Sequence, residues 1–149
     1  MRQNKTAENI PRIIPGAIHT DERGQLSFVN DFTFKDVSRF YLISHPNTEI
    51  IRAWQGHKIE RKYFYVVSGT FLICAVKIDD WSSPSQNLDV FEFKLSEEKS
   101  QVLVFPEGYA NGFRALKANS QLIVFSSLSL SESKNDDHRF PKEYWYNWN

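Results

Sequence analysis

Ionisable side chains crowd the stretch from residue 52 to residue 69, whose sequence is RAWQGHKIERKYFYVVSG. An imidazole, His57, and an ammonium group, Lys62, lie there directly before an apolar run. Charged groups are kept out of buried strands unless they meet a partner or a ligand, so this stretch predicts a pocket wall. A histidine exchanges a proton near neutral pH and a lysine stabilises negative charge on an oxygen, a pairing suited to proton transfer. The structural alternative is an interior His57 that donates to Glu60 or to a backbone carbonyl.

Short extended segments separated by turn signals must position these groups. No long window keeps the helical spacing of apolar residues without a Gly, Pro or β-branched interruption. About nine short strands with a turn every 8 to 12 residues favour an all-β sandwich or barrel. The expected strands are 25–30, 37–44, 48–55, 61–68, 70–78, 89–95, 101–105, 109–116 and 121–127.

Three regions follow from the composition along the chain. Residues 1–17 contain Pro11 and Pro15 and suit a loose or edge-paired N-terminal arm, which two subunits could exchange. Residues 18–130 form the barrel. Residues 131–149 join a charged run to an aromatic cluster, which either caps the outside of the barrel or forms a lid over a ligand.

The chain of 149 residues fits a single domain that needs no disulfide to hold its core. Its 18 basic residues match 18 acidic ones, so neither nucleic acid nor an anionic membrane is an expected partner. The single cysteine, Cys74, is expected to be a buried, inert thiol. No stretch has the apolar length of a signal peptide or a membrane span, which predicts a cytoplasmic protein. Residues 71–76 and 122–125 are apolar on both faces, and contact between subunits would cover the second face, so we expect a homodimer.

Four motifs resemble the sugar-nucleotide cupins. They are DERG at 21–24, RFY at 39–41, RAWQGHK at 52–58 leading into VVSG, and FPEGYANGF at 105–113. The similarity is to the dTDP-4-dehydrorhamnose 3,5-epimerases and to the dTDP-4-oxo-6-deoxyglucose 3,4-ketoisomerases with their WxcM-like relatives, and it covers residues 18–140. It implies a double-stranded β-helix, the cupin jelly roll, usually dimeric, with the ligand in the mouth of the barrel.

The resemblance also implies a reaction. The substrate would be a nucleotide-linked 4-keto-6-deoxy sugar, with dTDP as the expected carrier, used for surface polysaccharide synthesis. The enzyme would epimerise or isomerise it by moving a proton alpha to the ketone, which requires a base and a cation at the oxygen. Matched by position, His57 would be the base, Lys62 would lie near the sugar carbonyl, and Tyr109 would assist.

The substrate-binding residues follow from the same positions. Arg23, from its own subunit or across a dimer, and Arg52 would face the pyrophosphate. Tyr41 would help to hold the sugar. Gln55 and Asn111 stand where the relatives have histidines, and their amides can bind a hydroxyl or carbonyl group but cannot exchange a proton.

These departures leave a second hypothesis open, a sugar-nucleotide-binding cupin that has lost its acid and base. The tyrosine acid of the epimerases is expected near Ile123 or Val124, where this chain has none. Asn111 could instead be a turn residue in the left-handed conformation.

We predict no cofactor and no metal. A single histidine beside a lysine is a poor site for a divalent cation. The remaining histidines, His19, His45 and His138, lie in turn-like or charged stretches and are expected to be solvated.

Overall fold

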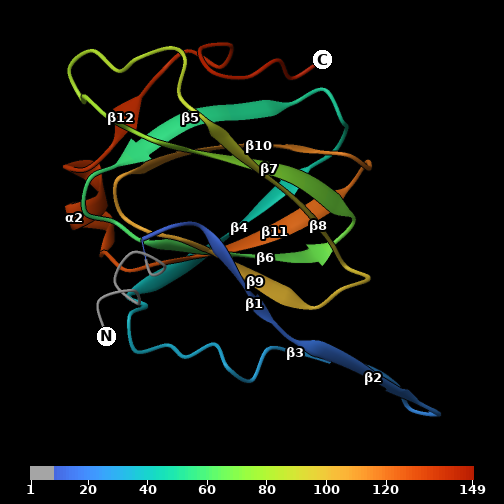
Figure 1. The fold of residues 1–149 in the computed structure, drawn as a ribbon. Helices are drawn as coiled ribbons and strands as arrows, with labels where there is room; N and C mark the ends of the chain where they lie inside the picture. Colours follow the sequence, from blue (N-terminus) through green and yellow to red (C-terminus); the bar gives the residue numbers. More distant parts are fainter. Residues whose placement is uncertain (1–8) are drawn as a thin grey trace.

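Two five-stranded antiparallel sheets face each other in the computed structural model, which describes residues 9–149 (Figure 1). One sheet has the order β1-β9-β6-β11-β4, the other β12-β5-β10-β7-β8, and β2 pairs only with β3. The strands are β1 (Arg12–Pro15), β2 (Ala17–Asp21), β3 (Gly24–Phe28), β4 (Arg39–His45), β5 (Ile51–His57), β6 (Lys62–Ser68), β7 (Thr70–Lys77), β8 (Val90–Ser96), β9 (Gln101–Phe105), β10 (Tyr109–Ala115), β11 (Ser120–Ser126) and β12 (His138–Arg139). The all-β prediction is confirmed.

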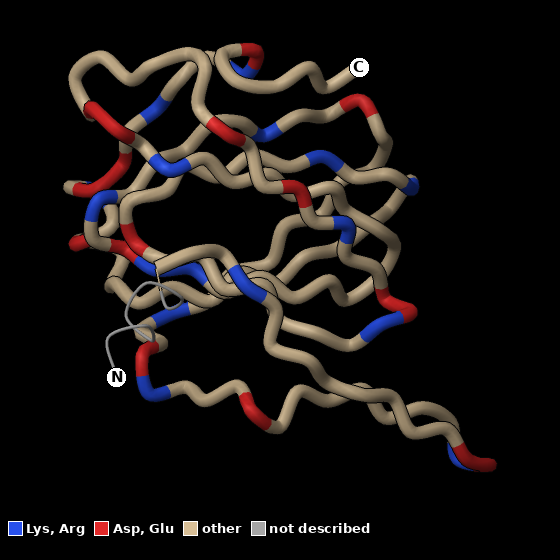
Figure 2. Tube along the Cα trace, in the orientation of Figure 1, with Lys and Arg blue, Asp and Glu red and all other residues tan. Residues whose placement is uncertain are grey.

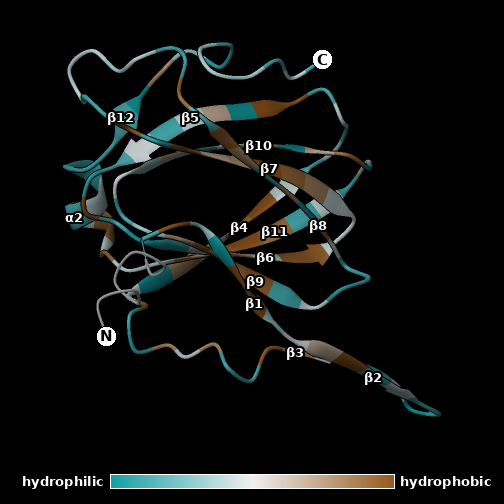
Figure 3. Ribbon diagram, in the orientation of Figure 1, coloured by the Kyte–Doolittle hydropathy of each residue, from teal (hydrophilic) through white to brown (hydrophobic). Residues whose placement is uncertain are grey.

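The main core lies between the two sheets. Phe113 of β10 packs against Phe64 of β6 and Phe71 of β7, with ring centroids 5.8 and 6.0 Å apart. Strand side chains alternate between the two faces, so every second residue of these strands enters the core. Figure 3 shows hydrophobic residues along the strands and hydrophilic residues in most connections, which is the pattern that fixes the register.

The C-terminal segment covers the outer face of the second sheet. Trp145 and Trp148 pack on Trp54 of β5, with ring centroids 5.3 and 5.6 Å away, and the same cluster buries Cys74 and Val76 of β7. Residues 71–76 are thus buried on both sides within one chain. The prediction that a second subunit covers this strand is therefore wrong, because the tail supplies the cover.

The outer face of the first sheet is only partly covered. Phe125 of β11 contacts Phe32 and Phe34, with ring centroids 5.3 and 5.5 Å apart, so the connection before β4 crosses this face. Phe40 and Leu42 of β4 stay 62% and 58% exposed. An apolar surface of this kind is available for contact with another molecule.

The β2–β3 hairpin stands away from the two sheets (Figures 1 and 2). Its turn uses Gly24 at φ 124°, a conformation that glycine adopts readily because it has no Cβ. At its base, the Ser100 hydroxyl donates to the carbonyl of Phe28. Residues 1–8 of the predicted arm lie outside the described residues, while β1 pairs antiparallel with β9 at the edge of the first sheet.

A short helix, α2 (Leu130–Lys134), precedes β12 and was not expected from the sequence. It begins after Ser129, whose side chain accepts from the backbone N–H of Glu132 while Glu132 bonds back to the Ser129 N–H. The helix is too short to produce a periodic pattern. No helix among residues 9–149 has the length and apolar character to cross a membrane.

Candidate functional site

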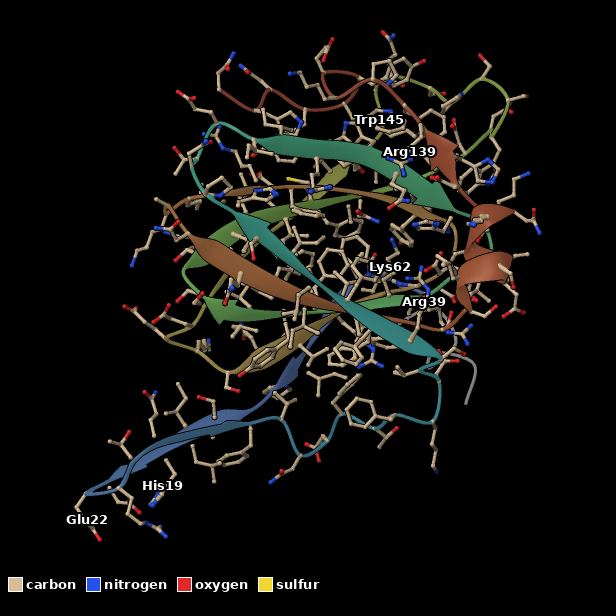
Figure 4. All side chains as sticks on the ribbon, turned by 180° about the vertical axis from the view of Figure 1, so that it is seen from behind. His19, Glu22, Arg39, Lys62, Arg139 and Trp145 are labelled. Atoms are coloured by element: carbon tan, nitrogen blue, oxygen red, sulfur yellow. The ribbon has the colours of Figure 1, made fainter. Side chains whose placement is uncertain are left out.

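A cavity of about 440 Å³ opens between the sheets. Arg39, Lys62 and Arg139 gather at one end of the barrel, beside α2 and β12 (Figure 4). The polar lining residues are Tyr41, Arg52, Gln55, Lys62, Asn111 and Arg139, and the rest of the wall is mostly apolar. Cationic groups outnumber anionic ones in this wall, so the cavity suits an anionic ligand.

A smaller pocket of about 140 Å³ adjoins this cavity. The two share Tyr41, Gln55 and Lys62 in their linings. His57 and Glu60 line the smaller pocket and not the larger cavity. His57 and Lys62, the predicted imidazole and ammonium groups, therefore line one pocket. Lys62, with Tyr41 and Gln55, also forms the boundary between that pocket and the main cavity.

A chain of polar contacts crosses this boundary and ends on the C-terminal segment. Lys62 Nζ donates to Gln55 Oε1 at 3.0 Å, and Gln55 Nε2 donates to Asp137 Oδ1 at 3.1 Å. Arg139 Nε donates to the same Asp137 oxygen at 2.6 Å. The amide of Gln55 thus links Lys62 of β6 to Asp137, the residue directly before β12.

His57 is buried with its two ring nitrogens in different situations. Nδ1 lies 2.7 Å from the backbone carbonyl of Asp136, an acceptor, so Nδ1 carries the proton. Nε2 is buried without a hydrogen-bond partner in the described residues. Burial and the nearby Lys62 cation lower the pKa of His57 below its ordinary value and outweigh the opposite effect of Glu60. A neutral imidazole with a free Nε2 is able to accept a proton.

Asp136 fixes the turn that follows His57. Its carboxylate accepts the backbone N–H groups of Lys58, Ile59 and Glu60 at 2.8, 2.9 and 2.8 Å. Burial raises the pKa of Asp136, but the three hydrogen bonds together have the larger effect and hold this pKa below its ordinary value. The turn 58–60 and the ring of His57 are both held by this one residue.

The same residues come closest to a metal-binding group. One ligand atom each of His57, Glu60 and Asp136 lies within 4.8 Å of the others. However, the Asp136 carboxylate already accepts three amides and Nδ1 of His57 donates to a carbonyl. This donor set does not fit a divalent cation, and the absence of a metal stays a prediction.

Arg52 is held at the cavity wall by an unexpected neighbour. Its Nε donates to Nε2 of His45 at 3.2 Å. His45 is fully buried between Phe71 and Phe113, so the prediction of a solvated His45 is wrong. The end of β4 turns this ring into the barrel, where burial and then the Arg52 charge lower its pKa and keep it a neutral acceptor. His19 has the exposed side chain expected of it.

Asn111 and Tyr41 both reach the cavity. Asn111 lies within β10 and is 4% exposed. Among the described residues the non-glycine residue with a positive φ is Asn119, not Asn111. The alternative of a left-handed turn residue at Asn111 is therefore wrong. Tyr41 lies between two cations, with the Arg39 guanidinium 5.0 Å and Lys62 Nζ 5.8 Å from its ring centroid. Both side chains are placed where they can contact a ligand.

Two predicted site residues lie elsewhere. The Tyr109 hydroxyl donates to the carbonyl of Asn9 at 2.9 Å, and its ring lines a different cavity. Arg23 lies at the tip of the hairpin and pairs with Asp21 at 2.7 Å. Figure 4 shows the hairpin, labelled at His19 and Glu22, projecting away from Lys62. Within one chain neither residue reaches the main cavity.

Two residues of the site, Arg39 and Arg139, were not among the predicted site residues, and Glu60 was expected only as a partner of an interior His57, a contact that the structure contains at 3.3 Å. Arg39 lies 3.7 Å from the buried carboxylate of Glu60, and Arg139 lines the main cavity. The charged run that ends at Arg139 was the available signal, since it belongs to the segment that was expected to cap the barrel or to form a lid over a ligand. Val124, near the position where a tyrosine was expected, pairs with Tyr41 of the neighbouring strand, which puts a phenol at that level of the barrel.

Comparison with known proteins gives both the fold and the family. A relative, the spore coat polysaccharide biosynthesis protein SpsL of Bacillus subtilis (strain 168), is 24% identical over 110 residues, which cover 71% of this chain and 70% of SpsL. The dTDP-4-dehydrorhamnose 3,5-epimerase of Sulfolobus tokodaii is similar in structure, with a TM-score of 0.73, 23% identity, and 90% of this chain and 78% of that chain covered. A 3,4-ketoisomerase from Helicobacter canadensis has a TM-score of 0.68, 17% identity, and coverage of 90% of this chain and 93% of that chain.

The structural neighbours confirm the predicted jelly-roll fold. The family model described as dTDP-4-dehydrorhamnose 3,5-epimerase matches residues 12–139, which is most of the chain. The resemblance that the four motifs predicted is confirmed by this match. The chain belongs to the dTDP-4-dehydrorhamnose 3,5-epimerase family.

Proposed function

We propose that this protein is an epimerase or ketoisomerase of a dTDP-linked 4-keto-6-deoxy sugar in surface polysaccharide biosynthesis. The observation that carries the proposal is the buried, unpartnered Nε2 of His57, a residue that lines the same pocket as Lys62. Membership of the epimerase family and the similarity to SpsL support the substrate class.

In the proposed reaction, Nε2 of His57 takes the proton alpha to the ketone. The C–H electron pair forms the C=C bond of the enolate, the carbonyl π pair moves onto the oxygen, and the Lys62 ammonium group stabilises the negative charge there. Protonation of the same carbon on the opposite face gives the epimer. Protonation of the former carbonyl carbon, with loss of the proton from the neighbouring hydroxyl group, gives the isomeric ketone. Lys62 is held for this role by Gln55, and Tyr41 borders both pockets and offers a hydroxyl to the sugar.

The larger cavity would receive the nucleotide. Arg52 and Arg139 line it and carry the fork-shaped guanidinium groups that suit phosphate oxygens. Asn111 offers an amide to a hydroxyl or carbonyl group of the ligand. Tyr109, whose hydroxyl already donates to Asn9, would act only through the packing of β10.

Arg23 would act across a homodimer. The hairpin projects from its own barrel, and Phe40 and Leu42 leave an apolar face for a second copy. An arm from one subunit that reaches the cavity of the other would bring Arg23 to the pyrophosphate. The homodimer, the cytoplasmic location and the absence of a nucleic-acid partner stay predictions.

The alternative, a binding module without catalysis, is not favoured. It requires the loss of both proton-transferring groups, whereas His57 keeps a neutral ring with a free nitrogen beside a lysine. The family to which the chain belongs is described as an epimerase.

The test is exchange of sugar protons for solvent deuterium, followed by NMR on a panel of dTDP-4-keto sugars. We expect exchange with the wild-type protein and none with His57→Ala, while Lys117→Ala, at an exposed position that lines neither pocket, exchanges normally. Binding of dTDP-sugars without exchange by the wild-type protein would contradict the proposal and support the binding module.

A further inference from the structure

Buried polar atoms without hydrogen-bond partners concentrate beside His57. Within residues 9–149 these atoms are Arg39 Nε, His45 Nδ1, His57 Nε2, Glu60 Oε1 and Arg114 Nε. Three of the five belong to Arg39, His57 and Glu60, residues that line the smaller pocket. An unpaired buried polar atom costs free energy, so a cluster of them points to a site that is used.

Glu60 is the most unusual member of this cluster. It is 2% exposed, and its Oε1 lies 3.3 Å from Nδ1 of His57. Its other oxygen accepts from the Ser126 hydroxyl and lies 3.7 Å from the Arg39 guanidinium. A buried carboxylate is expensive unless it is paired, and here one oxygen is paired while the other is directed at the imidazole.

We propose that Glu60 is a positioning residue that acts through His57, an inference that rests on the proposed function. When Nε2 of His57 takes the proton from the sugar carbon, the ring becomes an imidazolium with the new proton on Nε2 and the original one on Nδ1. Glu60 Oε1, 3.3 Å from Nδ1, stabilises the positive charge, while the Nδ1–H donates to the carbonyl of Asp136 and keeps the ring in one orientation. Glu60 itself does not touch the sugar.

The charges around His57 come from several elements. Lys62 faces it from β6 and disfavours the imidazolium, whereas Glu60 favours it. Asp136, from the segment after α2, also favours it, but its carboxylate is engaged with three amides. Asp137 follows in the same segment and is affected by the His57 charge, and Tyr109 is the register partner of His57 on β10. Beyond Glu60, Arg39 of β4 holds the carboxylate in place.

Glu60→Gln tests this role because it keeps the shape and removes the charge. We expect kcat for proton exchange to fall about 10- to 100-fold with little change in KM. Because the carboxylate raises the pKa of His57, the acid limb of the kcat profile should move to lower pH. Glu107→Gln is the matched control, since Glu107 pairs with Arg61 at 3.3 Å and does not contact His57.

An unchanged kcat, or a reduced kcat with an unmoved acid limb, would overturn the proposal. Should Glu60→Gln fail to fold, Glu60→Asp repeats the test, because the shorter side chain draws the carboxylate away from Nδ1. We expect the same direction of change by a smaller amount, and an unmoved limb with full activity would again overturn the role.

A second measurement separates this inference from the proposed function. The titration of His57 can be followed by NMR in the free protein, with and without Glu60→Gln. A lower pKa of His57 in the variant supports the contact even if no sugar undergoes exchange, in which case only the proposed function fails. An equal pKa in both proteins refutes the positioning role whatever the activity.

Discussion

Lys62 Nζ donates to Gln55 Oε1 across the boundary between the two pockets, at 3.0 Å. This contact fixes the ammonium group within reach of both the His57 pocket and the main cavity. The amide of Gln55 does not titrate, and its oxygen is an acceptor at every pH. Gln55 therefore offers the lysine an acceptor that does not change with pH.

Lys62→Met should remove the charge that stabilises the enolate and raise the pKa of His57, because the ammonium group lowers it. We expect kcat to fall about 100- to 1000-fold, the loss typical of a missing oxyanion donor. Titration of His57 by NMR checks the direction of the pKa change, with Lys117→Met, an exposed lysine, as the control. A lower or unchanged pKa of His57 in Lys62→Met would contradict the geometry.

Asp136→Asn should destabilise the fold at neutral pH by about 1–3 kcal/mol, because the amide cannot accept three backbone N–H groups as the carboxylate does. The folded-state pKa of Asp136 lies below its unfolded value, so its contribution is present above about pH 4 and is lost as the pH falls through the folded pKa. Urea unfolding at pH 7 and at pH 3 measures both. The difference should shrink at pH 3, and Asp31→Asn, an exposed aspartate, should show no such pattern.

Trp145→Ala should cost about 3–5 kcal/mol, the usual loss for a buried tryptophan. The ring packs against Trp54 at 5.3 Å, and its Nε1 donates to the carbonyl of Ser85 at 2.7 Å. Chemical denaturation gives the free energy of unfolding, with Leu116→Ala on an exposed side chain as the comparison. A loss below about 1 kcal/mol would mean that the tail does not cover the sheet in solution.

Arg23→Ala and His57→Ala should each be inactive alone and regain activity when co-expressed. If Arg23 serves the partner's cavity, a mixed dimer has one site with both residues intact, and random mixing restores about one quarter of the wild-type exchange rate. Deuterium exchange on the purified mixture measures this. Absence of any recovery, with dimers present by light scattering, would place Arg23 outside the site.

The sequence was sufficient for the architecture and for much of the cavity wall. Alternating strands predicted the two sheets, and the motifs brought Tyr41, Arg52 and Lys62 to the pockets where the structure has them. What it lacked was the set of residues that the chain after β11 contacts. The tail covers β7, and Asp136 holds His57 from 79 positions further along the chain, and contacts so distant in sequence leave no local pattern.

Buried polar groups were the second source of error. His45 follows an apolar run and precedes a proline, which is typical of a turn, yet it is fully buried as the acceptor for Arg52. Glu60 similarly lies in a charged turn, and only the folded chain shows that Ser126 and Arg39 enclose it. The residue type and its neighbours in sequence predict that such a residue is exposed, as most are, but they do not predict a partner that buries it.

The β2–β3 hairpin should unfold locally, without unfolding of the barrel. Its two strands of five residues pair with each other and with no third strand among residues 9–149, and ribbons of two strands are marginal in water. Its amides should therefore open to solvent many times for each global unfolding of the barrel. Any stabilisation of the hairpin by a second molecule depends on the protein concentration. Dilution should therefore increase the opening of the hairpin amides before it lowers the stability of the barrel.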